Sequence, residues 1–306
     1  MVGVSVVIPT LDGGDRLDSV LDAVMTQEGD DFDEIEIVCV DSGSRPPMRK
    51  RLDRKDVRVI DIPRGSFDHG ATRRLGIENT RGEFVALLTQ DARPADTRWL
   101  APLIDALRRD SEAAGAWSRQ LVRPGADPLE RWKMHHWSGS KREARRAGLP
   151  EGEGWDDLDP RRRYQVALFD DVSCCIRRSD WQRIPHRPVE FGEDLDWGRR
   201  VVEAGRRILF VPESRVVHSH PARTWSDARR VFADHRNIIR LTGWRTVPTL
   251  GTVPRAAIGG LLDMTRFVWR TSPPSARPGP LVRSIPYALG LAAAQWAASA
   301  KERAAR

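Results

Sequence analysis

The first hundred residues alternate short β-branched runs with segments of helical character, and this alternation constrains the fold more than any other feature. Apolar runs occupy 4–8, 35–40, 57–62 and 84–89, and the segment 15–27 and the one that begins at Thr72 have helical spacing. A strand followed by a helix, repeated along the chain, predicts a parallel sheet with crossover helices. A further helix is expected at 99–109 and a further strand at 114–121.

Polar residues directly follow three of these runs. Thr10 and Asp12 follow the first, Asp41 closes the second and opens an Asp-Ser-Gly-Ser turn, and Asp91 follows the fourth. Ligands of open α/β sheets bind beyond the carboxyl ends of the strands, so we expect these four side chains to gather at one edge. Asp91 could hold a divalent cation that bridges two phosphates. The alternative for Asp91 is a helix cap.

The second half of the chain is less regular. We expect an irregular connection at 123–165, a strand or strand pair at 166–177, and two strands at 208–211 and 216–219. Helices are expected at 179–183 and 194–204. After Pro221 the sequence turns to arginine-rich amphipathic helices punctuated by prolines, and we place a domain boundary near residue 222.

Two further groups carry possible chemistry in this half. Glu193 and Asp194 stand at a helix start, where acids complement the helix dipole or where one could act as a general base. His218 and His220 are two residues apart on an expected strand and therefore share a face. A neutral His218 imidazole facing Asp91 would complete a metal site. The alternative is that His218 is a surface or core histidine at a strand end and binds no metal. Zinc shared with Cys174 or Cys175 is supported only weakly by the spacing.

The net charge of the chain is compatible with several kinds of binding partner and does not distinguish between them. The 306 residues carry a net charge of +7, mostly from arginine. Such a balance suits nucleic acid, anionic lipid or phosphate-bearing substrates, and a general bias toward arginine would also produce it. The three cysteines offer no disulfide framework, which favours a reducing cytoplasm. The apolar segment 284–300 falls short of a typical span of ~20 residues and is expected to be a buried or interfacial helix.

Taken in order, these motifs resemble family 2 of the inverting glycosyltransferases, and within it the rhamnosyltransferase-like branch. The resemblance covers roughly 4–220. It is carried by VSVVIPTLDGG (4–14), VDSGS (40–44), FDHGATRR (67–74), RGEFVALLTQDARPAD (81–96), FDDVSCCIRRSDW (169–181), GEDLDWGRRVVEAG (192–205) and VVHSH (216–220).

The resemblance implies an α/β, Rossmann-like nucleotide-diphospho-sugar transferase (GT-A) fold with a mixed central sheet. The catalytic domain would be 1–221, with a nucleotide-binding half at about 1–122 and an acceptor half at about 123–221, and 222–306 would be a helical extension. Asp194 would be the catalytic base with Glu193 beside it, and Asp91 and His218 would bind Mg²⁺ or Mn²⁺. The nucleotide-sugar would contact Pro9, Thr10, Asp12, Asp41, Gly43, His69, Gly70, Arg73, Gln90 and Asp91, with Arg73 near the phosphates.

The departures from the family pattern are informative. Members usually carry Asp-x-Asp at the metal position, whereas this chain has Gln90-Asp91-Ala92 and one carboxylate. The Thr-Gln-Asp-Ala form is typical of the rhamnosyltransferase-like branch. The Gln-x-x-Arg-Trp signature of processive synthases is missing, since Glu130-Arg131-Trp132 falls in the wrong place, so a single addition is expected.

The branch resemblance points to dTDP-L-rhamnose as donor, with UDP-sugars and GDP-sugars as alternatives. The acceptor would be a saccharide or a polyprenyl-diphosphate-linked sugar, used in cell-surface polysaccharide or glycolipid assembly at the inner face of the membrane. We expect a cytoplasmic protein, peripheral at that face, with a homodimer as one open arrangement and with no nucleic-acid partner. A non-catalytic nucleotide- or glycan-binding module is the rival; it would keep Asp41 but could dispense with Asp91, Asp194 and His218.

Overall fold

The computed structural model describes residues 3–29, 32, 34–51, 56–189 and 191–305. By its contacts the chain forms two compact units. The first comprises 1–121, 141–158 and 165–218, and the second comprises 122–140, 159–164 and 219–306. The segments 122–140 and 159–164 thus belong with the C-terminal helices, while the functional division at residues 122 and 222 stays a prediction.

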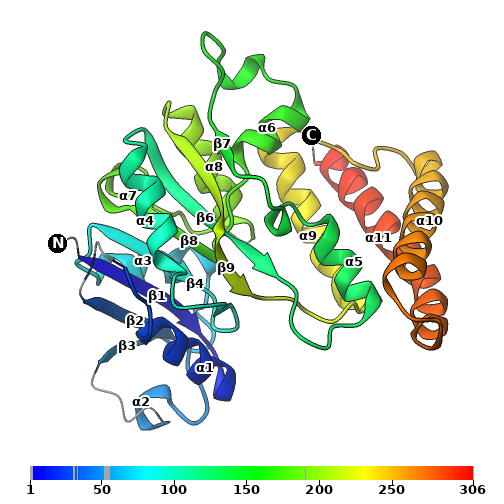
Figure 1. The fold of residues 1–306 in the computed structure, drawn as a ribbon. Helices are drawn as coiled ribbons and strands as arrows, with labels where there is room; N and C mark the ends of the chain where they lie inside the picture. Colours follow the sequence, from blue (N-terminus) through cyan, green and yellow to red (C-terminus); the bar gives the residue numbers. More distant parts are fainter. Residues whose placement is uncertain (1–2, 30–31, 33, 52–55, 190, 306) are drawn as a thin grey trace. The chain divides into compact units, whose positions relative to one another are not determined.

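The first unit is an α/β unit (Figure 1). Its strands are β1 (Val4–Thr10), β2 (Ile35–Asp41), β3 (Val57–Asp61), β4 (Phe84–Leu88), β5 (Arg93–Pro94), β6 (Ala113–Leu121), β7 (Arg145–Ala147), β8 (Ser173–Arg177) and β9 (Arg207–Val217). Its helices are α1 (Gly14–Met25), α2 (Met48–Arg51), α3 (His69–Glu78), α4 (Leu100–Arg109), α7 (Arg178–Arg183) and α8 (Glu193–Glu203). Helix α6 (Pro160–Ala167) runs from residues of the second unit into the first.

The strands form one mixed sheet in the order β3-β2-β1-β4-β8-β6-β9-β5, with β7 paired to β9. Strands β1 to β4 are parallel, β8 is antiparallel to both β4 and β6, and β6 is parallel to β9. Because of these directions, β1, β2, β4, β6 and β9 end at the same edge of the sheet at which β8 begins. The expected mixed α/β fold is confirmed.

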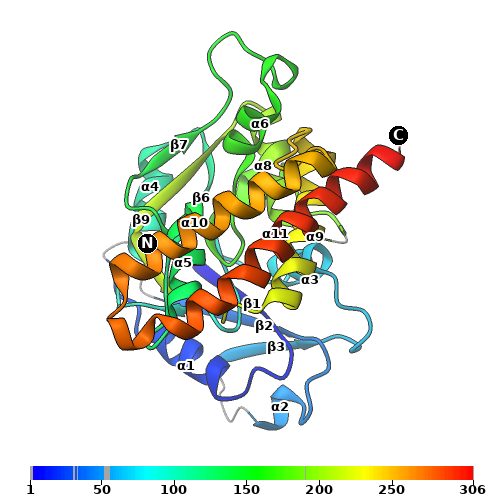
Figure 2. The same ribbon diagram turned by 90° about the vertical axis from the view of Figure 1, so that its right-hand side faces the viewer.

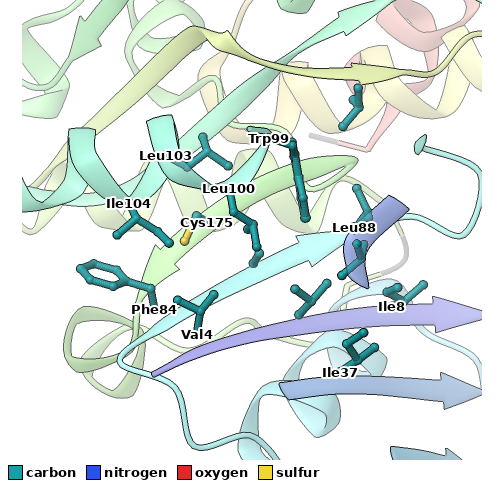
Figure 3. Close-up of a cluster of buried hydrophobic side chains, with 14 of the residues drawn as sticks. Val4, Ile8, Ile37, Phe84, Leu88, Trp99, Leu100, Leu103, Ile104 and Cys175 are labelled. Atoms are coloured by element: carbon teal, nitrogen blue, oxygen red, sulfur yellow. The ribbon is translucent and has the colours of Figure 1, made fainter. Parts of the chain in front are cut away.

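The sheet is buried on both faces, which explains the continuous apolar runs in the sequence. On one face, side chains of β1 and β4 such as Val4, Ile8 and Leu88 pack with α4 residues in the core shown in Figure 3. On the other face α3 crosses β1 and β2 closely, since a Cβ on Gly76 would stand 2.3 Å from Val7 Cγ1. This packing directs the start of α3 toward the edge where the strands end.

The expectation of an irregular connection at 123–165 is wrong. Helix α5 (Pro128–His136) begins at Asp127, whose carboxylate accepts the backbone N–H of Leu129 at 2.8 Å, and α6 follows Asp159, which accepts that of Arg161 at 2.9 Å. Both starts are Asp-Pro pairs, a helix signal that the high charge of the segment obscured. At 166–177 only 173–177 is a strand, since 166 and 167 close α6.

Strand β9 is also one strand and not the two that were expected. Pro212 suggested a break, but β9 passes through it by an irregularity opposite β6. Ser118 pairs with Val211 and the next residue, Arg119, pairs with Arg215. The three residues of β9 between Val211 and Arg215 therefore have no paired residue in β6.

The second unit is helical, as expected for the C-terminal part. It contains α5, α9 (Thr224–Thr242), α10 (Val253–Thr271) and α11 (Pro278–Ala304), and Figure 2 shows α10 and α11 side by side. Its core joins Leu129 of α5 to Met264 and Val268 of α10 and to Tyr287 of α11. Tyr287 Oη donates to Asp227 at 2.6 Å. Among the described residues, no helix has both the length and the hydropathy needed to cross a membrane.

Candidate active site

The ends of β1 and β4 are joined directly by polar side chains. Gln90 Oε1 accepts hydrogen bonds from Thr10 Oγ1 at 2.8 Å and from the Leu11 backbone at 2.9 Å, and its Nε2 donates to the Leu11 carbonyl at 3.1 Å. Gln90 therefore fixes the turn that follows β1. Pro9 and Thr10 lie level with Val40 and Asp41 of β2, so the expected convergence at this edge is present.

Asp41 is buried and holds the turn that follows β2. Its Oδ1 accepts the Ser44 backbone N–H at 3.0 Å, and its Oδ2 accepts that of Met48 at 3.1 Å. Ser44 Oγ in turn accepts the Asp12 N–H at 2.8 Å. Asp41 therefore shapes the loop through its own carboxylate, and its contact with a nucleoside stays a prediction.

Asp12 and Gly43 both adopt a positive φ, of 50° and 80°. Asp12 is exposed and pairs with Arg64 at 2.5 Å, which together with the Arg45 N–H lowers the pKa of the carboxyl. Gly43 lies against Arg64, where a Cβ would stand 3.0 Å from the Arg64 backbone nitrogen. The two turns are thus linked into one rim.

A hollow of about 350 Å³ opens beside this rim. Its lining residues come from the turn after β1, the start of α1 and the end of β4: Asp12, Gly13, Asp15, Arg16, Gln90 and Asp91. A hollow at the carboxyl ends of parallel strands is where α/β proteins bind nucleotides.

Asp91 at this hollow faces His218, which directly follows β9. Asp91 Oδ1 lies 3.6 Å from His218 Nε2. His218 Nδ1 donates to Gln120 Oε1 at 2.8 Å, and Gln120 Nε2 donates to Asp170 Oδ2. Because Gln120 Oε1 only accepts, the proton of a neutral His218 must sit on Nδ1. The Nε2 lone pair is then directed at Asp91.

This pair suits a divalent ion. Two adjacent ligand atoms that are each about 2.1 Å from an octahedral ion lie about 3 Å apart. A shift of about 0.6 Å would therefore let Asp91 Oδ1 and His218 Nε2 bind the same ion. A carboxylate suits Mg²⁺ or Mn²⁺, and an imidazole suits later divalent metals such as Zn²⁺. The hydrogen bond from Nδ1 to a side-chain oxygen is the arrangement typical of metal-binding histidines. The residues present therefore fit a metal, with Gln120 as the group that orients one ligand.

A second cluster is built around the buried Arg73 of α3. Arg73 Nη1 pairs with Glu193 Oε1 at 2.8 Å, and its Nε lies 3.4 Å from Asp171 Oδ2. Asp171 Oδ2 also contacts His186 Nε2 at 3.1 Å, and His186 Nδ1 accepts from Trp181 at 3.0 Å. The guanidinium thus faces protein carboxylates, and its expected contact with donor phosphates stays a prediction.

Asp194 lies within the field of these carboxylates. Burial, followed by the charges of Glu193, Asp171 and Asp170, raises the pKa of Asp194 well above its usual range. Burial likewise raises the pKa of Asp170 to about 6. A carboxylate whose pKa is raised accepts a proton more readily, as a general base must. The same residues connect the two clusters, because Asp170 also binds Gln120.

Gly70 and His69 begin α3 beside this cluster. A Cβ on Gly70 would stand 1.9 Å from the Arg187 carbonyl oxygen, so only glycine lets α3 approach the chain before α8. His69 is partly buried, and burial lowers its pKa. Their contact with the nucleotide-sugar stays a prediction.

Sequence reasoning missed four residues of this site: Gln120, Asp170, Asp171 and His186. Gln120 is near the end of a strand that the sequence predicts, so its place at the edge could have been found. Asp170 and Asp171 stand before β8, and they reach the edge only because β8 is antiparallel. Cys174 Sγ contacts Asp171 and Cys175 lies in the core, so neither supports a zinc site with His218.

The mixed sheet, with acids and a histidine at the edge where its parallel strands end, is a GT-A fold. The model of Glycosyl transferase family 2 matches residues 5–181, more than half of the chain, and the chain belongs to this family.

Two curated relatives add detail. The O-antigen chain rhamnosyltransferase RfbN of Salmonella typhimurium is 25% identical over 235 residues, which span 75% of this chain and 70% of the relative. The O-antigen chain rhamnosyltransferase WbaN of Salmonella anatum is 24% identical over 206 residues, which span 64% of this chain and 60% of the relative.

Solved structures share the fold. The mannosyltransferase PcManGT from Pyrobaculum calidifontis, in complex with GDP-Man and Mn²⁺, aligns with a TM-score of 0.53 at 18% identity over 97% of this chain and 75% of that one. S. aureus TarS in complex with UDP-GlcNAc aligns with a TM-score of 0.52 at 14% identity over 99% and 92%.

Proposed function

We propose that this chain transfers one sugar from a nucleoside-diphosphate donor to an acceptor hydroxyl with inversion, and that the donor is dTDP-L-rhamnose. The observation that carries the proposal is the Asp91–His218 pair beside the hollow at the strand ends. The two O-antigen rhamnosyltransferases among the relatives support the choice of sugar. The acceptor would be a growing cell-surface saccharide on a polyprenyl-diphosphate lipid at the inner membrane face.

Asp194 acts as the base in this proposal. It takes the proton of the acceptor hydroxyl while the acceptor oxygen bonds to the anomeric carbon from the face opposite the diphosphate. The bond to the diphosphate oxygen breaks, and that oxygen keeps the electron pair. Glu193 is held by Arg73 next to the base. Its charge helps keep the pKa of Asp194 raised.

The donor would lie along the rim made by Thr10, Asp12, Asp41 and Gln90. Asp91 and His218 would hold Mg²⁺ or Mn²⁺, which when bound neutralises charge on the leaving diphosphate. Gln120 would keep His218 in the tautomer whose Nε2 carries no proton.

A donor screen tests the proposal. The purified chain is mixed with Mn²⁺ and with dTDP-L-rhamnose, UDP-sugars or GDP-sugars, and nucleoside diphosphate released by slow hydrolysis is measured. Release from dTDP-L-rhamnose is expected, and Asp91→Ala should abolish it. Asp96→Ala is the matched control, because Asp96 pairs with Arg215 away from the hollow lining.

Each alternative gives a different result. Release from a UDP- or GDP-sugar alone would keep the enzyme class and reject rhamnose. Nucleotide binding without release from any donor would indicate a non-catalytic module instead.

A further inference from the structure

The two long helices α10 and α11 of the second unit expose large apolar side chains. Three lie on α10 and three on α11, and their exposed fractions run from 49% at Leu262 to 70% at Val282. They are Ile258, Leu262, Trp269, Val282, Ile285 and Leu289. We call these six side chains, with the exposed arginines of the same two helices, the α10–α11 face.

The spacing shows that the exposure is not scattered. Positions 258, 262 and 269 share one side of α10, and positions 282, 285 and 289 share one side of α11. The other side of each helix is buried, at Met264 and Val268 in α10 and at Tyr287 in α11. Both helices therefore have a second apolar side beyond the one that builds the core.

The charge on this face is positive. Arg255, Arg266 and Arg270 lie on the exposed side of α10, and Arg283 is exposed on α11. The sequence from 253 to 300 contains a single acidic residue, Asp263. Asp263 is engaged within the unit, where it accepts from Trp132 Nε1 at 2.6 Å and lies 2.8 Å from His136. Arg283 pairs with Asp127 at the start of α5, where its Nη2 lies 3.3 Å from Asp127 Oδ1. The positive charge of the face therefore rests on the three arginines of α10.

Apolar ridges edged by arginine fit the surface of a bilayer that contains anionic lipid. The apolar side chains can enter the acyl boundary while the long arginine side chains reach the phosphates. A second copy of the chain fits poorly, because a two-fold contact would place this basic face against itself. We propose that the α10–α11 face binds the surface of anionic membranes.

This surface proposal is independent of the proposed function, because vesicle binding is measured without a sugar donor. The full chain is floated with vesicles of phosphatidylcholine plus phosphatidylglycerol and with vesicles of phosphatidylcholine alone. The wild-type chain should float with the anionic vesicles, and added salt should weaken its binding. Failure to float with them would overturn the proposal and leave the transferase proposal untouched.

Matched substitutions locate the contact. Leu262→Ser should weaken binding by about tenfold, while Met25→Ser, an exposed apolar side chain of the first unit, should not. Arg266→Ser should weaken binding by about fivefold, while Arg109→Ser on α4 should not. All four side chains are exposed, so folding should be retained. Equal behaviour of Leu262→Ser and Met25→Ser would refute the proposal. So would a Leu262→Ser variant that converts a dimer to a monomer in sedimentation, since the face would then bind a second copy.

Discussion

Replacing Gln120 by leucine removes the link between His218 and Asp170 while nearly conserving side-chain size. Gln120 and Asp170 are both almost fully buried, so the loss of the amide leaves the Asp170 carboxyl and the His218 Nδ1–H each short of one partner. A buried group left without its partner costs about 1–3 kcal/mol in unfolding free energy. Loss of the group that orients a metal-binding histidine typically costs about 10–100-fold in metal affinity, or about 1.4–2.7 kcal/mol.

The measurement is the Mn²⁺ dissociation constant of the folded protein, followed by electron paramagnetic resonance with and without dTDP. Nitrogen-15 spectra of the His218 ring in the metal-free protein report the tautomer separately. The wild-type ring should carry its proton on Nδ1, and Gln120→Leu should populate the Nε2–H form.

Gln27→Leu is the matched control. Gln27 is also buried, and its side chain donates to Asp96 O at 2.8 Å and accepts from Trp99 N at 2.7 Å, with no contact to His218. Gln27→Leu should lower the melting temperature at least as much as Gln120→Leu yet keep the Mn²⁺ affinity. Wild-type Mn²⁺ affinity and an unchanged tautomer in Gln120→Leu would refute the role assigned to Gln120.

Two further substitutions and one pH titration test the acidic cluster and the start of α3 beside it. Asp194→Asn should lower kcat by about 10²–10⁴-fold, and near-normal turnover in steady-state assays would exclude Asp194 as the base. At a pH above the raised pKa of Asp194, the substitution should also raise the melting temperature, because it removes a charge that the fold disfavours. Because the pKa of Asp194 is raised, kcat/KM should increase as pH rises through that pKa. The contribution of Asp194 to folding stability should decrease over the pH range from its unfolded pKa to its raised folded pKa. If Asp194→Asn keeps the same rise of kcat/KM with pH, that rise belongs to another group. Gly70→Ala should destabilise the protein by several kcal/mol in denaturant unfolding, because its Cβ would meet the Arg187 carbonyl; an unchanged midpoint would show that α3 shifts freely.

The sequence predicts the first four strands of the sheet well because the sheet is buried on both faces. Continuous apolar runs such as 84–89 mark such strands without any knowledge of their neighbours. The acids that directly follow them, Asp41 and Asp91, could then be placed at one edge by the rule that parallel strands end together. His218 could be placed there too, although its strand was divided in two.

The other side of the site depends on strand direction, which local patterns do not encode. Asp170 and Asp171 reach the edge because β8 runs antiparallel to β4, and a predicted strand at 166–177 gives no direction. Gln120 meets its partners across 50 and 98 residues of sequence, so no spacing reveals the link. The helix starts at Asp127 and Asp159 were locally encoded and could have been found.

The irregularity in β9 fixes the number of residues between Val211 and Arg215, although none of the residues between them belongs to the Asp91–His218 pair. Side chains alternate between the two faces of a strand, so a change of one residue between Val211 and Arg215 would turn every later residue of β9 to the opposite face. His218 would then point away from Asp91, although the deleted residue, for example the exposed Glu213, touches neither. Point substitutions at Glu213 should be silent in homologous chains, whereas single-residue insertions or deletions there should be selected against.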